Sequence, residues 1–181
     1  FAERHGWPLY LKRPNGGYDG RGVWRAPDRT TADAALDAAG SGLLVEPVIR
    51  FDHELSVIVA RSGRGETVAY PPVETVQRDG RCHEVFTPAT VGDQQLRDAR
   101  SLAVTIANAI DLVGTMAVEL FATTGGLLLN ELAVRTHNSG HLTIEACATS
   151  QFENHLRAIL DLPLGATHLT VPAAAMVNLV G

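Results

Sequence analysis

The chain has 181 residues and is 45% hydrophobic, which is enough apolar material to bury a core in one domain or in two small lobes. Its net charge of −5 and pI near 5.8 provide no basic field, and the arginines are scattered, so we expect no nucleic-acid partner. Since no apolar run approaches the roughly 20 residues of a membrane span, we also expect no membrane contact.

The first half of the chain reads mainly as strands. Residues 7–12 have strand character and lead through the loop KRPNGGYDGRG into VWRA, where a second strand begins. Residues 30–39 have helical composition, with Thr30 or Thr31 as the N-cap and Gly40 beyond the end. Further strands are predicted over 43–49, 54–60 and 66–77, the last interrupted by Pro71 and Pro72.

The second half combines helices with a hairpin. From Asp93 onward apolar residues recur at helical spacing, which predicts a long amphipathic helix. Two strands, MAVELF and LLLNEL, are joined by ATTGG, and a second helix is predicted over 149–160, closed by Pro163 and Gly165. This mixture of hairpins and helices indicates an α+β fold.

The cysteines and the chain ends give two more expectations. Cys82 and Cys147 match neither a metal pair nor a disulfide framework, which favours ordinary buried thiols and a cytoplasmic location. The chain opens on FAERHGW, which reads as the last turn of a helix, and closes on AAAMVNLVG, which reads as a strand cut short. We therefore expect it to be a piece of a longer polypeptide.

Two glutamates face each other in the predicted hairpin. If Thr123 opposes Leu127, the register places Glu119 directly across from Glu131, with Cβ atoms about 5 Å apart, and such like charges destabilise a sheet. A magnesium ion would offset the repulsion, with the carbonyl of Asn130 as a further oxygen ligand if the strand bulges there. The alternative is an arginine partner for one glutamate and a protonated or peripheral second one. The neighbours expected on their face are apolar: Ala117, Phe121, Leu127 and Leu129.

The glycine-rich loop suits phosphate binding. Four glycines within seven residues leave backbone amides unshielded, and Lys12 precedes them with a point charge. An isolated loop of this kind is more often a surface hairpin. Glu46 and Glu54 flank the turn PVIRFDH, where their carboxylates would accept hydrogen bonds from sugar hydroxyls or from an adenine amino group, or would be solvated edge residues.

Together these segments resemble the ATP-grasp enzymes. The similarity covers nearly the whole chain, and the run HNSGH followed by TSQFENHLRAI is most similar to the branch of 5-(carboxyamino)imidazole ribonucleotide synthases. The resemblance implies an ATP-grasp fold of two α+β lobes, with residues 1–45 as the small lobe that carries the phosphate loop. Residues 46–165 would form the large lobe with the metal and acceptor site, and residues 166–181 would begin a truncated C-terminal domain.

The resemblance also implies an ATP site. Lys12 would contact the phosphates, and the loop from Gly16 to Gly22 would be a lid over them. Glu46 would approach the adenine amino group, the backbone around Val48 would form the hinge contact, and Glu54 would bind the ribose. The loop glycines of this site are Gly16, Gly17 and Gly20.

The acceptor site implied by the resemblance lies at the second strand of the hairpin and just beyond it. Glu119 and Glu131 would carry one or two magnesium ions. Bicarbonate and the transferred phosphate would meet three catalytic residues: Arg135, His137 and Asn138. The aminoimidazole nucleotide would meet Tyr18, Asp19, Arg135 and Ser139.

The implied reaction is the ATP-dependent carboxylation of 5-aminoimidazole ribonucleotide with bicarbonate through carboxyphosphate, a ligase step of de novo purine synthesis, in a protein that is often dimeric. The family commonly has APRPHNSGH, whereas Val134 and Thr136 here replace the two prolines beside Arg135, which makes the turn less rigid. The sequence leaves open a different ATP-grasp carboxylate–amine ligase, a non-catalytic nucleotide-binding module, and a metallohydrolase using His137 and His141.

Overall fold

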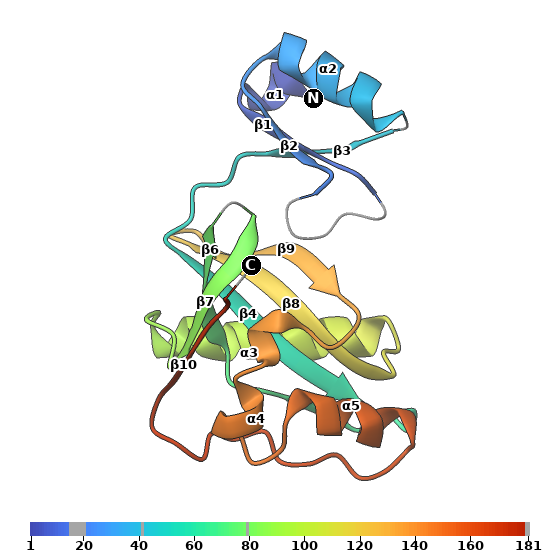
Figure 1. Cartoon of the computed structure of the whole chain (residues 1–181), viewed down its shortest axis with the longest axis vertical. Coiled ribbons are helices and arrows are strands. Elements are labelled where there is room, and N and C mark those ends of the chain that lie inside the picture. The colour runs from blue at the N-terminus through green and yellow to red at the C-terminus, as the bar shows by residue number, and fades with distance from the viewer. Residues whose placement is uncertain (15–20, 41, 79, 180–181) are drawn as a thin grey trace. The chain divides into compact units, whose positions relative to one another are not determined.

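The computed structural model describes residues 1–14, 21–40, 42–78 and 80–179 (Figure 1). The chain divides into two compact units, here called unit 1 (Phe1–Arg50 with Arg78–Arg81) and unit 2 (Phe51–Gln77 with Cys82–Gly181). The strand Leu44–Pro47 pairs within unit 1, and the lobe boundary at residue 45 stays a prediction. Residues 166–177 contribute a strand to the sheet of unit 2, and their place at the start of a further domain stays a prediction.

Unit 1 is built on a three-stranded antiparallel sheet in the order β2-β1-β3. Helix α2 begins after Asp28, whose carboxylate accepts hydrogen bonds from the backbone N and the hydroxyl of Thr31, at 2.8 and 2.9 Å. The prediction of Thr30 or Thr31 as the cap is therefore wrong, since Asp28 stands at the N-cap position and reaches the third amide of the helix. Gly40 ends α2 in the left-handed conformation, as predicted. The elements are α1 (Ala2–His5), β1 (Leu9–Lys12), β2 (Val23–Ala26), α2 (Arg29–Ala39) and β3 (Leu44–Pro47).

Unit 2 contains a seven-stranded sheet in the order β10-β7-β6-β4-β8-β9, with β5 paired to β4. The strand predicted over 66–77 is divided at Pro71 and Pro72, as expected of residues that break a ladder. The sequence patterns do not predict β7. The strands are β4 (His53–Arg61), β5 (Thr67–Ala69), β6 (Val73–Arg78), β7 (Arg81–Thr87), β8 (Gly114–Thr123), β9 (Gly126–Ala133) and β10 (Ala174–Val177).

Helix α3 (Asp93–Ala109) covers one face of this sheet (Figure 1). Its buried positions are Ala99, Ala103 and Ala107, spaced four residues apart along one face of the helix. Small side chains there let the helix lie close to the apolar residues of the two central strands, which are themselves buried. The long amphipathic helix predicted from the sequence is confirmed, and it packs on the principal core of the unit.

The opposite face of the sheet is covered by short elements: η1 (Asn138–Gly140), α4 (Thr143–Ala146) and α5 (Gln151–Ile159). The sequence patterns predict α5 but not η1 or α4. The buried hydroxyl of Tyr70 donates to the carbonyl of Thr149 at 3.0 Å and accepts from Nδ2 of Asn154 at 2.8 Å. Asn154 also exchanges hydrogen bonds with the backbone of Gly165, so this polar cluster fixes α5 against the sheet.

A second polar cluster fixes the loop before α3. Glu74 contacts Nδ1 of His53 at 2.9 Å and accepts from the backbone N and hydroxyl of Thr90, at 2.8 and 2.6 Å. Burial opposes ionisation of Glu74, but the hydrogen bonds from His53 and Thr90 outweigh burial and hold its pKa below the usual value. The ionised carboxylate therefore stabilises the folded state.

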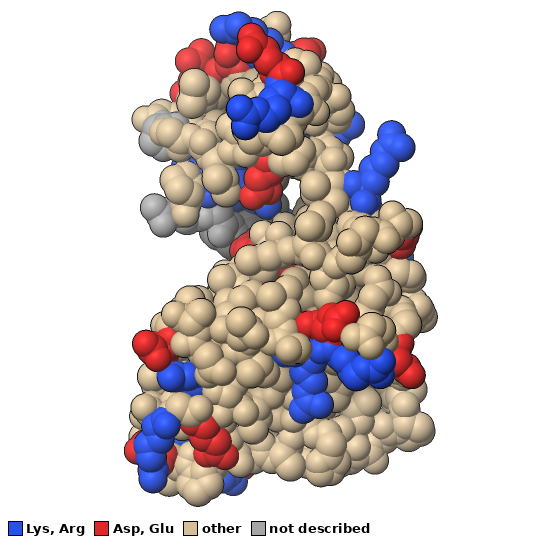
Figure 2. Space-filling model, turned by 180° about the vertical axis from the view of Figure 1, so that it is seen from behind, with Lys and Arg blue, Asp and Glu red and all other residues tan. Residues whose placement is uncertain are grey.

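On the face of unit 2 that Figure 2 shows, positive and negative side chains are interspersed. Ion pairs join Arg61 to Asp111 at 3.0 Å and Arg157 to Glu153 at 2.7 Å. Among the described residues, no helix combines the length and the apolar composition that a membrane crossing requires.

Candidate functional site

The hairpin of β8 and β9 brings the two predicted metal ligands together. Glu119 and Glu131 are direct partners in the antiparallel register, as predicted. The turn end differs from the assumed register, because Thr123 pairs with Gly126 and not with Leu127. A bulge next to Glu119 adds one residue, Asn130, to β9 and restores the pairing of the two glutamates.

The bulge also changes which residues surround the glutamates. Leu127 packs against the core under α3, on the face opposite Glu119, whereas Leu128 pairs with Phe121. The side chain of Glu119 is only 14% exposed, but Glu131 is exposed to solvent. The expectation of a uniformly apolar surrounding is therefore wrong for Glu131. Because Glu131 contacts solvent, water weakens the repulsion between the two carboxylates.

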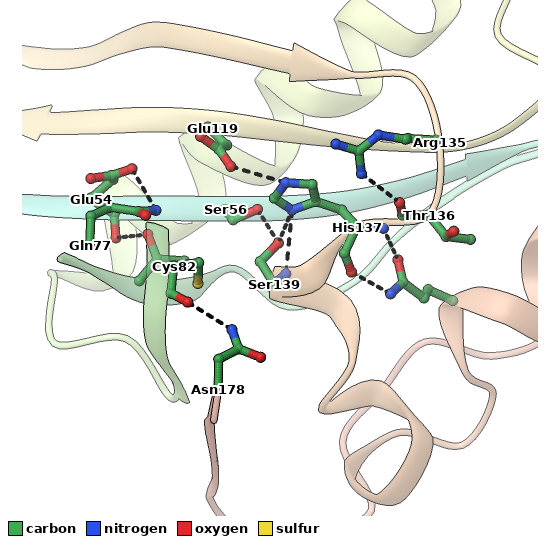
Figure 3. Close-up of polar contacts among 12 residues, drawn as sticks. Glu54, Ser56, Gln77, Cys82, Glu119, Arg135, Thr136, His137, Ser139 and Asn178 are labelled. Atoms are coloured by element: carbon green, nitrogen blue, oxygen red, sulfur yellow. Dashed lines mark hydrogen bonds and ion pairs between the residues drawn. The ribbon is translucent and has the colours of Figure 1, made fainter. Parts of the chain in front are cut away.

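His137 connects the loop after β9 to Glu119 (Figure 3). Its Nε2 lies 3.3 Å from Oε1 of Glu119, and its Nδ1 lies 2.9 Å from the hydroxyl of Ser139. The backbone N of Ser139 donates to the same Nδ1 at 3.3 Å, which requires a lone pair on that atom. This hydrogen-bond pattern assigns the proton of the neutral imidazole to Nε2, facing the carboxylate of Glu119.

A residue of the sheet, Ser56 on β4, holds Ser139 in place. Its hydroxyl lies 2.7 Å from that of Ser56, and both side chains are fully buried. Ser56 is the register partner of Glu119 on the neighbouring strand, so the hydroxyl of Ser56 joins Ser139 of η1 to the strand beside Glu119 (Figure 3). The structure thus brings together three residues predicted from the sequence, Glu119, His137 and Ser139, and adds Ser56, which no local motif indicated.

The other two predicted catalytic residues lie in the same loop. Arg135 is exposed, and its Nη1 donates to the carbonyl of Thr136 at 3.0 Å. The Oδ1 atom of Asn138 is buried and has no hydrogen-bond partner within the described part of the chain. A buried acceptor without a donor is costly, so Asn138 supplies a site at which a donor group would be stabilised.

Glu54 lies on β4 near this cluster. The residue is 9% exposed, and its carboxylate accepts a hydrogen bond from Nε2 of Gln77 at 3.2 Å. Burial, together with the carboxylates of Glu119 and Glu54, raises the pKa of the Cys82 thiol to about 11, which keeps it protonated at neutral pH. Sequence reasoning missed Gln77, although it lies two residues beyond Thr75, the register partner of Glu54, and so shares a strand face with Thr75.

In unit 1 the structure joins two predicted ATP-contacting residues to each other. Nζ of Lys12 lies 2.7 Å from Oε2 of Glu46, with the two side chains 21% and 34% exposed. The contact is diagonal across the β1–β3 ladder, where long side chains on one face meet. Val48 directly follows β3. The remaining predicted residues lie outside the described part of the chain: Gly16, Gly17, Tyr18, Asp19 and Gly20.

Comparison with known proteins identifies the family of the chain. The model of the ATP-grasp domain matches residues 1–152. The chain belongs to the ATP-grasp family. The predicted resemblance and the α+β ATP-grasp fold are thereby confirmed.

The ATP-grasp chain is similar to enzymes with closely related names. It is 50% identical to the N5-carboxyaminoimidazole ribonucleotide synthase of Mycobacterium tuberculosis (strain H37Rv), over 100% of this chain and 43% of that protein. An N5-carboxyaminoimidazole ribonucleotide synthetase solved as an ADP complex matches with a TM-score of 0.90 at 41% identity, over 98% of this chain and 47% of that one. The N5-carboxyaminoimidazole synthase of Aspergillus clavatus was solved with ADP and 5-aminoimidazole ribonucleotide. It matches with a TM-score of 0.89 at 40% identity, over 99% of this chain and 47% of that one. The chain therefore spans less than half the length of these relatives.

The geometry argues against a metallohydrolase. Nδ1 and Nε2 of His137 face Ser139 and Glu119, while His141 is exposed and its ring lies 5.8 Å from that of Phe152. Within the described ranges, no group of three or more histidine, cysteine, aspartate or glutamate residues is placed to hold a metal on its own. Any metal bound at Glu119 and Glu131 would need ligands from a second molecule such as a nucleotide.

Proposed function

We propose that the protein is a cytoplasmic ATP-dependent ligase that carboxylates 5-aminoimidazole ribonucleotide with bicarbonate, giving 5-(carboxyamino)imidazole ribonucleotide, ADP and phosphate in purine biosynthesis. One observation supports this most strongly. Over nearly its whole length the chain matches enzymes named for this product, one of them solved with ADP and 5-aminoimidazole ribonucleotide. The cluster of Glu119, His137 and Ser139 provides the polar groups that such a reaction requires.

In this proposal ATP binding uses the residues that the resemblance implies. Lys12 binds the phosphates, Glu46 and the backbone at Val48 bind adenine, and Glu54 binds the ribose. Because Lys12 and Glu46 form an ion pair at 2.7 Å, nucleotide binding would exchange that pair for two new contacts. The ammonium group would meet phosphate, and the freed carboxylate would accept from the adenine amino group. Gly16, Gly17 and Gly20 are proposed to bind the phosphate chain.

The carboxylate pair fits a magnesium ion. Magnesium prefers oxygen ligands and is commonly held by one or two carboxylates together with the phosphates of a nucleotide. Glu119 and Glu131 supply such a pair from adjacent strands, and the solvent-exposed position of Glu131 leaves room for phosphate oxygens. When bound, the ion would neutralise charge on the transferring phosphoryl group.

The loop residues act on the acceptor. An oxygen of bicarbonate attacks the γ-phosphorus, the bond to ADP breaks, and carboxyphosphate forms. The guanidinium of Arg135 suits bidentate binding of bicarbonate or phosphate, and Nε2–H of His137 can donate to an oxygen that becomes negative. The buried Oδ1 of Asn138 would accept from the hydroxyl of bicarbonate.

In the second stage the exocyclic amine of the nucleotide attacks the carboxyl carbon. The bond between the carboxyl carbon and the bridging phosphate oxygen breaks, phosphate leaves with that oxygen, and the amine loses one proton. Tyr18, Asp19, Arg135 and Ser139 are proposed to position this nucleotide. Exclusion of water matters at this stage, because water would otherwise consume the carboxyphosphate.

The test is ADP release by the complete gene product that contains this sequence. The proposal expects release that requires both bicarbonate and 5-aminoimidazole ribonucleotide. Release stimulated by an amino acid instead would indicate a carboxylate–amine ligase, and ATP binding without any release would indicate a nucleotide-binding module. The proposed homodimer would appear in analytical ultracentrifugation as twice the mass of one chain.

A further inference from the structure

The side chain of Gln151, the first residue of α5, forms hydrogen bonds with the backbone of His137. Its side chain is fully buried. Oε1 accepts from the backbone N of His137 at 3.0 Å, and Nε2 donates to the backbone O of the same residue at 2.6 Å. The amide thus contacts both backbone hydrogen-bonding groups of a single residue.

Gln151 is itself fixed in place. Its backbone N donates to the hydroxyl of Thr143 at 2.9 Å, and that hydroxyl donates to the carbonyl of Gly140 at 2.6 Å. A Cβ at Gly140 would lie 2.6 Å from Cδ and Oε1 of Gln151, so only glycine leaves room for the amide. These contacts join the loop of His137, α4 and α5 into one network.

The loop has a few backbone hydrogen bonds of its own, such as Gly140 N to the carbonyl of His137 at 3.1 Å, but it lacks the prolines beside Arg135 that are common in the family. The residues on either side of Arg135, namely Val134 and Thr136, leave φ free, as a proline would not. Two hydrogen bonds from one rigid amide fix both the position and the rotation of the backbone at His137, whereas a single bond would permit rotation. The direction of the imidazole toward Glu119 and Ser139 depends on that rotation.

We propose that Gln151 is a positioning residue that orients the imidazole of His137. The role rests on the proposed function, in which His137 donates from Nε2 to the reacting oxygens. Burying an amide costs free energy, because two polar atoms lose their contacts with water, and an apolar side chain of the same length would fill the space without that cost. Both of those atoms are matched by the backbone groups of His137.

The experiment compares Gln151→Met and Gln151→Glu in the complete gene product. Methionine keeps the length and removes both hydrogen bonds. A protonated glutamic acid keeps one acceptor and one O–H donor, whereas the ionised form cannot donate to the carbonyl of His137. Gln94 in α3 is exposed and bonds to Asp98 and Arg97, so the same two substitutions there are matched controls.

We expect Gln151→Met to lower kcat by about 10- to 100-fold, the range that a misplacement of about 1 Å produces. Its KM for ATP stays within about twofold of the unsubstituted enzyme. Gln151→Glu loses activity at high pH and regains it as the pH falls through the pKa of the buried carboxyl group, which burial raises. The unsubstituted enzyme and Gln94→Glu supply the reference pH profiles.

A spectroscopic readout separates this inference from the proposed function. In ¹⁵N spectra the imidazole of His137 should show the Nε2–H tautomer in the unsubstituted protein and in the Gln94 variants, and a mixture of tautomers in folded Gln151→Met. If no ADP is released by the unsubstituted protein, the proposed function fails and the imidazole spectra still test the positioning role. An unchanged tautomer together with an unchanged kcat in Gln151→Met, or a reference-like pH profile for Gln151→Glu, would overturn it.

Discussion

The substitution Gly140→Ala tests the network around His137 through stability alone. The new Cβ would lie 2.6 Å from Cδ and Oε1 of Gln151 and 2.8 Å from its Nε2. Carbon atoms normally approach to about 3.5–4.0 Å, so the side chain of Gln151 would have to move by roughly 1 Å. Because Gln151 is fully buried, that movement separates it from the backbone of His137.

The cost of Gly140→Ala has two parts. Forcing an extra methyl into a packed interior costs about 1–3 kcal/mol. Weakening two hydrogen bonds adds about 0.5–1.5 kcal/mol for each. We therefore expect the free energy of unfolding to fall by roughly 2–6 kcal/mol if both hydrogen bonds are lost.

Urea denaturation followed by far-UV circular dichroism measures this loss. Gly63→Ala is the matched control, because Gly63 is not among the described glycines with positive φ and nothing lies within 4 Å of its added Cβ. It should leave stability unchanged or raise it by about 0.4–1 kcal/mol through the unfolded chain. Equal free energies of unfolding for Gly140→Ala and the unsubstituted protein would refute the close packing of Gly140 against Gln151.

Three further substitutions test separate parts of unit 2. Glu131→Gln should abolish magnesium-dependent turnover and leave stability unchanged to within about 1 kcal/mol, since it removes a proposed metal ligand and a cross-strand repulsion. Tyr70→Phe should lower the free energy of unfolding by about 1–3 kcal/mol, because it leaves the carbonyl of Thr149 without its donor. Glu74→Gln should reduce the loss in the free energy of unfolding that accompanies a fall in pH. The pKa of Glu74 is lowered on folding, so its contribution is present above the unfolded-state pKa and is lost as the pH falls through the folded-state pKa.

Each of these predictions has its own control. For Glu131→Gln, an unchanged magnesium dependence of turnover would contradict the metal assignment. Tyr10→Phe, at a partly exposed tyrosine of unit 1, shows the effect of losing a hydroxyl outside the buried cluster. For Glu74, urea unfolding across about pH 3–6 should show a steeper acid loss in the unsubstituted protein, and parallel profiles would contradict the reasoning.

Periodic patterns predicted the elements that depend on neighbours along the chain. The apolar spacing after Asp93 predicted α3, and the alanines at four-residue intervals are indeed its buried face. The β8–β9 hairpin predicted that Glu119 opposes Glu131, and this is correct although the assumed turn register is not. The bulge at Asn130 adds one residue to β9, which compensates for the one-residue difference at the turn. No periodicity in the sequence indicates a bulge, because a bulge depends on the hydrogen bonds between two strands.

The sequence by itself determined where most of the strands and the three longer helices lie, and which polar residues gather after β9. Only the tertiary structure decided the partners of those residues: Gln151 for the backbone of His137, Ser56 for Ser139, and Glu46 for Lys12. The reason is physical. Local periodicity follows from backbone geometry and is written in neighbouring residues, whereas these contacts join distant segments and depend on how the strands and the short helices pack together.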